Sequence, residues 1–157
     1  MSKVKIADEK TDLRRGIDHI GVSVCSVIHD GNGRILLMKR GPEARDENGC
    51  WDICGGAVEF GESIDEAVKR EVHEELCAKP IEIDFVTAYD AHREHDGNKT
   101  HWVALVHVVK VDPGRVRIGE PHKISEIGWF TKDTLPEPRH SQFDKSFSQI
   151  LPLGIVK

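Results

Sequence analysis

The stretch that decides the fold is GGAVEFGESIDEAVKREVHEELCA, residues 55–78. Its second half predicts a helix that begins at Ser63, because Ser63 and Glu66 have the spacing of a capping box. The helix is expected to run to about Ala78, since Pro80 cannot continue it. The strongest structural signal in the chain is therefore an acidic helix entered through a glycine-rich segment.

Two glutamates of this helix lie on the face that should enter the core. At 100° per residue, Glu71 and Glu75 fall within the apolar arc and Glu74 falls on its edge. Like charges one turn apart repel each other, and burial adds to that cost. Arg70 on the flank compensates in part, and Mg²⁺ bound between the carboxylates would offset the rest. The alternative is a purely structural ion-pair cluster. The apolar arc itself consists of Ile64, Ala67, Val68, Val72 and Leu76.

The glycines before the helix give an independent indication of a ligand site. Gly55-Gly56 is expected to break a short strand at Trp51–Cys54, and with Gly61 it allows a tight turn and a close approach to a ligand. The segment leads into a helix N-terminus, where free N–H groups favour anions. Combined with the carboxylates that follow, this pattern predicts a site for a metal and a phosphate.

Residues 56–78 resemble the signature of the Nudix hydrolases, G-x5-E-x7-R-E-U-x-E-E-x-G-U, in which U is aliphatic. One position departs from it, because Cys77 replaces the late glycine and Ala78 takes the aliphatic position. That glycine helps the chain leave the helix, so the substitution affects the cap and no catalytic group. The matching residues are Gly56, Glu62, Arg70, Glu71, Val72, Glu74 and Glu75.

The resemblance implies an α/β fold with a mixed sheet, the Nudix α/β/α sandwich, as a single domain over residues 1–157. It also implies hydrolysis of a diphosphate linkage by water, with Mg²⁺ as cofactor and Mn²⁺ as a possible substitute. The segments GGAVEFGE and EPHKISEIGWF are similar to the MutT-like branch, which converts nucleoside triphosphates to monophosphates and pyrophosphate. ADP-ribose or another nucleoside diphosphate-X remains an alternative substrate.

Carried over by position, the resemblance assigns roles to the signature residues. Glu71, Glu74 and Glu75 would be metal ligands, one of them would also be the general base, and the Gly55 carbonyl would complete the metal shell. Two further residues of the catalytic set, Glu62 and Arg70, would brace the loop and the helix through ionic contacts.

Candidates outside the signature each have a plainer alternative. Arg40 could hold a phosphate together with Gly55 and Gly56, or could form a surface ion pair. Glu120 could be a further metal ligand or base, or a solvated loop residue. Three aromatic residues could stack on a base or belong to the core: Trp51, Tyr89 and Trp102.

The remaining chain predicts strands joined by turns and one further helix. Residues 1–16 are expected to be loosely ordered, and HREHDGNK (92–99) is expected to be a hairpin loop. Ser141 is the expected N-cap of a helix at Ser141–Leu151. The predicted strands are His19–His29 and Arg34–Arg40, which form a hairpin, then Ile81–His92, Thr100–Val111 and Ile127–Phe130.

Composition limits the partners. The net charge is −5, with 22 basic and 27 acidic residues, so no basic footprint for long nucleic acid is present. No apolar run reaches the length of a membrane span, and the expected location is the cytoplasm. A small nucleotide substrate and a possible homodimer are compatible with this pattern. Rival functions are a non-catalytic nucleotide-binding domain and an enzyme similar to isopentenyl-diphosphate isomerase.

Overall fold

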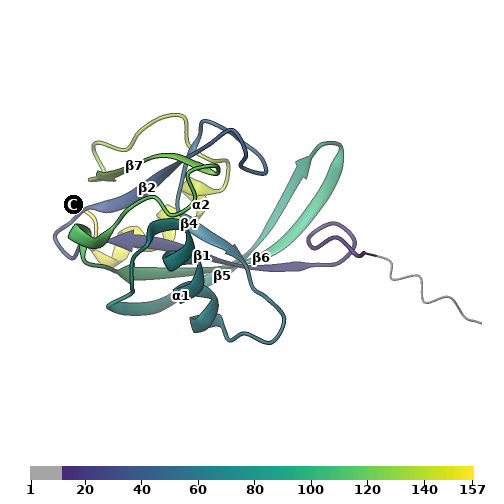
Figure 1. The fold of residues 1–157 in the computed structure, drawn as a ribbon, viewed down its shortest axis with the longest axis horizontal. Coiled ribbons are helices and arrows are strands. Elements are labelled where there is room, and N and C mark those ends of the chain that lie inside the picture. Colours follow the sequence, from purple (N-terminus) through teal and green to yellow (C-terminus); the bar gives the residue numbers. More distant parts are fainter. Residues whose placement is uncertain (1–11) are drawn as a thin grey trace, which may run out of the picture.

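A mixed β-sheet forms the centre of the protein in the computed structural model, which describes residues 12–157 (Figure 1). The strand order is β3-β2-β1-β6-β5, with β4 also paired to β1 and β7 to β2. β1 and β6 run parallel, and the other pairs are antiparallel. The expected α/β class with a mixed sheet is confirmed. The strands are β1 (Gly21–His29), β2 (Ile35–Arg40), β3 (Trp51–Asp52), β4 (Cys54–Ala57), β5 (Glu82–His95), β6 (Asn98–Lys110) and β7 (Ile124–Phe130).

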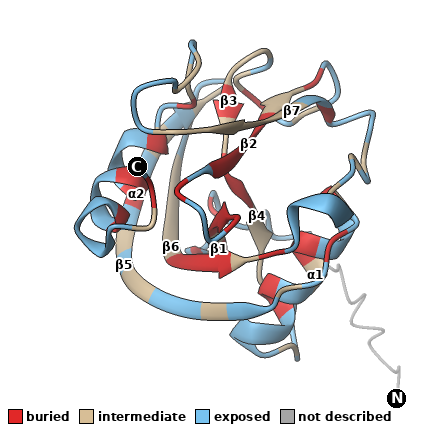
Figure 2. Cartoon of the chain, turned by 90° about the vertical axis from the view of Figure 1, so that its left-hand side faces the viewer, coloured by how far each residue is buried: buried red, intermediate tan, exposed pale blue. Residues whose placement is uncertain are grey.

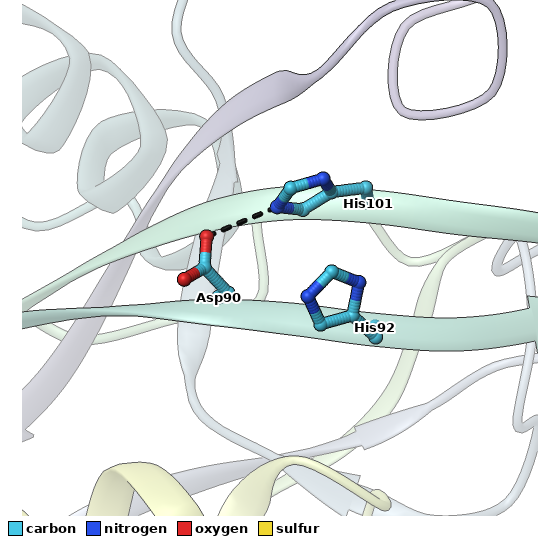
Figure 3. A group of neighbouring side chains, drawn as sticks. All are labelled: Asp90, His92 and His101. Carbon is cyan, nitrogen blue, oxygen red and sulfur yellow. Dashed lines mark hydrogen bonds and ion pairs between the residues drawn. The ribbon is translucent and has the colours of Figure 1, made fainter.

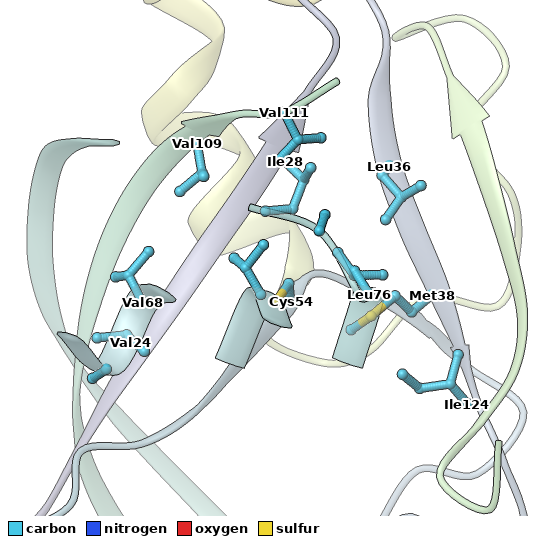
Figure 4. Packing of buried hydrophobic residues seen from close by; sticks show 13 residues of the cluster. Val24, Ile28, Leu36, Met38, Cys54, Val68, Leu76, Val109, Val111 and Ile124 are labelled. Carbon is cyan, nitrogen blue, oxygen red and sulfur yellow. The ribbon is translucent and has the colours of Figure 1, made fainter. Parts of the chain in front are cut away.

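Helices cover the two faces of this sheet. Successive strand residues point to opposite faces, so Ile28 packs in the cluster under α1 (Ile64–Leu76), and Val27 packs in the cluster under α2 (Phe143–Ile150). Figure 4 shows the first cluster, and Figure 2 shows how the buried residues concentrate along the central strands and the inner sides of the helices. This is the expected α/β/α sandwich. Short 3₁₀ turns lie at Pro113–Arg115 and Leu151–Leu153.

Helix α1 has the predicted capping box. The Glu66 N–H donates to Ser63 Oγ at 3.2 Å, and the Ser63 N–H donates to Glu66 Oε2 at 2.7 Å. Glu71 is buried with the apolar residues of the helix, whereas Ile64 at its start is 36% exposed. The helix ends at Leu76, and Cys77 follows in the left-handed conformation with φ 52°.

The predicted loop at residues 92–99 was wrong. β5 continues to His95 and β6 begins at Asn98, so only Asp96-Gly97 forms the turn. Charged side chains near the tip, such as Glu94 and Lys99, are exposed to water while the two backbones pair, so their polarity does not oppose a strand. In Figure 1 the tip of the hairpin projects from the body of the domain.

The prediction that Gly55-Gly56 ends a strand was also wrong, because both residues belong to β4. Cys25 pairs with Gly55 and Val24 with Gly56, so glycine here permits close strand approach. A Cβ atom on Gly55 would lie 2.2 Å from the Val24 carbonyl oxygen.

Ser141 does not cap α2. The helix begins at Phe143 after Gln142, whose side chain makes no cap hydrogen bond. The Ser141 hydroxyl instead donates to Glu47 at 2.9 Å, because a carboxylate from a distant loop lies within its reach. The expected loose segment at residues 1–16 lies outside the described residues as far as residue 11. Within residues 12–157, no helix is long and apolar enough to cross a membrane.

Candidate active site

The glycines of β4 face the glutamates of α1. A Cβ atom on Gly56 would lie 2.2 Å from Glu71 Oε1, so the absence of a side chain makes the space that this carboxylate fills. The Gly55 N–H donates to Glu75 Oε2 at 3.1 Å. Strand and helix therefore place two carboxylates against a backbone that has no side chains to obstruct a ligand.

Burial leaves these carboxylates short of positive charge. Burial raises the pKa of Glu75 to about 8, and the nearby negative charge of Glu71 acts in the same direction. The pKa of Glu71, which is 8% exposed, is also raised by burial although Arg70 opposes the shift. Glu74 lies at the exposed edge of the group. A cation bound here would favour the charged forms of both side chains.

Arg70 ties the glycine-rich loop to the helix. Its guanidinium donates to Glu62 Oε1 at 2.7 Å and to the Ala57 carbonyl at 2.9 Å. It also contacts Glu71 at 2.6 Å and Glu74 at 3.3 Å. The hydrogen bonds from Arg70 lower the pKa of the Glu62 carboxyl to about 2. Arg70 and Glu62 thus have contacts suited to positioning the loop and the other glutamates.

Glu120 comes to the same site from the loop before β7. The Gly119 N–H donates to the Glu75 carbonyl at 2.8 Å, which fixes this loop on the end of α1. A Cβ atom on Gly119 would lie 2.0 Å from the Glu74 carbonyl oxygen, so the close contact requires glycine. Glu120 is 20% exposed, pairs with Lys123 at 3.0 Å, and lines one pocket with the three glutamates.

That pocket has a volume of about 470 Å³, which falls in the range of small-ligand sites. Tyr89 and Trp102 line it, so either ring is placed to contact a ligand. Trp51 is 6% exposed and packs edge-on against Phe130, so it is a core residue. The pocket is also lined by Cys25, Gly55, Asp52, Tyr89, His140 and Ser146.

Arg40 lies in the pocket wall but is bound to carboxylates. Its guanidinium contacts Asp46 Oδ1 at 2.8 Å and Asp52 Oδ2 at 3.3 Å. The structure therefore shows the ion-pair alternative for this residue. Burial raises the pKa of Asp52, although His140 and Arg40 oppose the shift.

A network of ion pairs that the sequence did not predict surrounds Arg40 in the pocket wall. Glu47 accepts from the Ser141 N–H at 2.8 Å, lies 2.9 Å from His140 Nε2 and also pairs with Arg93. Arg93 contacts Asp46 at 3.0 Å. His140, whose Nε2 lies 3.8 Å from Asp46 Oδ1, lowers the pKa of Asp46 together with the charges of Arg93 and Arg40. These residues come from three separate segments, and no spacing in the sequence relates them.

The carboxylates of α1 and of the loop before β7 fit a hard divalent cation. Glu71, Glu74, Glu75 and Glu120 offer only carboxylate oxygens, which suit Mg²⁺ or Mn²⁺ better than zinc. Arg70 holds oxygens of Glu71 and Glu74, while Glu75 accepts from Gly55. A divalent ion would supply the positive charge that the raised pKa values indicate is missing.

Comparison with known proteins identifies the family. The model of the NUDIX domain matches residues 19–150. The chain belongs to the Nudix family. An ADP-ribose pyrophosphatase of Methanocaldococcus jannaschii is 33% identical over 132 residues, which cover 82% of this chain and 73% of that protein. A CTP pyrophosphohydrolase of Escherichia coli is 35% identical over 80 residues, covering 51% of this chain and 57% of the relative.

Solved Nudix structures show the same fold. A MutT NUDIX hydrolase from Burkholderia pseudomallei has a TM-score of 0.75 and 32% identity, covering 84% of this chain and 98% of the other. The NUDIX domain of Shewanella oneidensis NrtR, solved with ADP ribose, has a TM-score of 0.72 at 16% identity, covers 98% of this chain and 99% of that one, and supports the fold alone. This chain is a Nudix hydrolase, as expected from its signature, and Nudix hydrolases use a divalent metal.

Proposed function

We propose that this Nudix hydrolase converts a nucleoside triphosphate, canonical or oxidised, to the nucleoside monophosphate and pyrophosphate with Mg²⁺. One observation carries the proposal: the glutamates and Glu120 line the same pocket of about 470 Å³ as Tyr89 and Trp102. A pocket of this size accommodates one nucleotide.

The residues of the chain have distinct roles in this proposal. Glu71, Glu74 and Glu75 hold the cation, with the Gly55 carbonyl as a further ligand. When bound, Mg²⁺ lowers the pKa of a coordinated water and screens the phosphate charges. Arg70 and Glu62 keep the glutamates in place, and Glu120 is an additional ligand or the base that accepts the proton of the attacking water.

A nucleoside diphosphate-X such as ADP-ribose is the second candidate. The archaeal relative that aligns with 82% of this chain is named an ADP-ribose pyrophosphatase. Charge also favours a diphosphate, because two arginines in the pocket wall, Arg40 and Arg93, are paired with carboxylates. A triphosphate brings about four negative charges and would depend on bound cations to balance them.

A substrate panel with product analysis distinguishes the candidates. Canonical and 8-oxo nucleoside triphosphates, ADP-ribose and dinucleoside polyphosphates are incubated with Mg²⁺, and the products are resolved by chromatography. Monophosphate and pyrophosphate formed from a triphosphate support the proposal. A kcat/KM for ADP-ribose about ten-fold above every triphosphate would establish the second candidate instead. The Glu75→Gln protein, purified identically, controls for contaminating phosphatases.

A further inference from the structure

A cluster of two histidines and one aspartate lies outside the glutamate site, on the hairpin formed by β5 and β6 (Figure 3). One ligand atom from each of Asp90, His92 and His101 lies within 4.8 Å of the others. His101 Nε2 is 3.0 Å from Asp90 Oδ1, and the two imidazole rings have centroids 4.2 Å apart. We propose that this cluster binds a divalent transition-metal ion of the zinc class.

Strand register brings the three side chains together. His92 and His101 are direct partners across the antiparallel pair, so their side chains lie on the same face. Asp90 precedes His92 by two residues and therefore points to that face as well. The arrangement is fixed by the backbone pairing of two long strands, and a metal would need only side-chain rotation to collect its ligands.

The cluster is open to solvent on one side. The Asp90 side chain is 64% exposed and the His101 side chain is 34% exposed. His92 and His101 also line a pocket of about 290 Å³ together with His19 and Lys99. An ion can therefore enter freely, and water can occupy its remaining coordination position.

The donor set selects a class of metal. Two imidazoles and one carboxylate suit Zn²⁺, Ni²⁺, Co²⁺ or Cu²⁺, whereas Mg²⁺ prefers oxygen ligands throughout. Two positive charges oppose binding. Lys99 lines the same pocket as the two histidines, and Lys145 donates to the Asp90 carbonyl at 3.0 Å. Metal–imidazole bonding has to exceed that repulsion, so we expect an affinity below that of a closed four-ligand zinc site.

In a second group of residues with suitable donor types, the carboxylates are already engaged in ion pairs. Asp46, Glu47 and His140 also bring ligand atoms within 4.8 Å of one another. Their carboxylates are already neutralised by Arg40 and Arg93, which occupy the positions that an ion would need. Within residues 12–157, no arginine pairs with Asp90 of the hairpin cluster, so this cluster is the better metal site.

The proposed site lies opposite the active-site wall. Tyr89, Ala91 and Arg93 alternate with Asp90 and His92 along β5, and these three residues line the nucleotide pocket. An ion on one face of this strand would therefore stiffen a segment whose other face lines the pocket proposed for the nucleotide.

Metal titration of the untagged full-length protein tests the proposal. Co²⁺ is the probe, because its visible absorption reports nitrogen ligation, and Zn²⁺ binding is measured by calorimetry. With millimolar Mg²⁺ present to occupy the glutamate site, we expect one Co²⁺ per chain, displaced by Zn²⁺. Glu75→Gln should bind Co²⁺ as the parent does, since the glutamate site is separate.

Matched variants locate the ion. His92→Asn combined with His101→Asn should weaken binding by at least about 100-fold, beyond the loss caused by removing an outer partner of a ligand. Asp90→Asn, a single exposed change that spares the fold, should weaken it in the same direction. His73→Asn combined with His95→Asn removes the same number of histidines, one of them from the same hairpin, and should leave binding intact. Unchanged affinity in the His92/His101 double variant, or loss of binding in Glu75→Gln, would overturn the site.

Discussion

Gly56 and Glu71 occupy complementary space: a Cβ atom on Gly56 would lie 2.2 Å from Glu71 Oε1. The glycine of β4 thus determines where a carboxylate of α1 can lie. Gly56→Ala should displace that carboxylate and lower kcat/KM by at least ~10²-fold, the scale of losing a major electrostatic group. Gly114→Ala is the matched control, because its new Cβ atom would meet only Asp112 Oδ1 at 3.3 Å. Equal activity of the two variants would contradict this relationship.

Replacing Glu71 or Glu75 by glutamine should separate catalysis from stability. Burial disfavours the charged form of both side chains in the metal-free protein, and a neutral amide does not carry that cost, so the melting temperature should hold or rise. Activity should fall by at least ~10²-fold in each variant. Glu82→Gln, at a surface ion pair with Lys110, controls for the loss of an exposed charge. Near-normal turnover in both active-site variants would exclude the assigned roles.

Mg²⁺ should stabilise the folded protein by mass action. An ion that binds the native glutamates and not the unfolded chain raises the melting temperature with its concentration. Differential scanning fluorimetry with millimolar Mg²⁺ or Mn²⁺ should show the rise, and chelation should reverse it. The Glu75→Gln protein should respond much less. The site would be rejected if the parent showed neither a thermal shift nor heat of binding in calorimetry.

The raised pKa of Glu75 predicts how stability depends on pH without metal. Burial raises this pKa from 4.5 to about 8 in the folded protein. Below the unfolded value both states carry the proton, and between the two values only the folded state does. The free energy of unfolding must therefore decrease as pH rises through this window. Melting temperatures in chelator from about pH 5 to about pH 8 should fall more steeply for the parent than for Glu75→Gln. If the melting temperatures of the two proteins fell equally with pH, Glu75 would not be the group with the raised pKa.

Cys77 should gain stability when replaced by glycine. It ends α1 with φ 52°, a conformation that costs a residue with a Cβ atom about 1 kcal/mol. Cys77→Gly should be neutral to stabilising with unchanged activity, measured by denaturant unfolding and initial rates. Cys77→Ala retains the Cβ atom and should show no such gain. A clear loss of stability in the glycine variant alone would indicate that packing of the thiol outweighs the backbone cost.

Local signals predicted the helix that carries the site. The capping box of Ser63 and Glu66, and the position of Glu71 in the apolar arc, depend only on neighbours along the chain, and the structure shows both. The hairpin at Asp30–Gly33 was also readable, because an aspartate and two glycines favour a tight turn. The signature has a glycine where this chain has Cys77, and this difference indicated that Cys77 lies at the end of the helix.

Long-range pairing determined what the sequence could not show. The sequence predicted that Gly55 ends a strand. In the structure Gly55 pairs with Cys25, and this pairing explains why a side chain is excluded there. Arg40 has its partners at Asp46 and Asp52, and nothing in the local sequence predicts which carboxylates reach it. Glu47 bonds Ser141 across the fold, which removed the expected helix cap.

The parallel pairing of β1 with β6 also has a consequence for synthesis of the protein. Gly21 pairs with Trp102, so about 80 residues must be made before this central contact can form. During translation α1 leaves the ribosome well before β6. One edge of β1 therefore stays unpaired until β6 has been made. Contacts between residues so distant in the chain slow folding, because a long loop must close first. The second half of the chain therefore determines when the first half acquires a protected core.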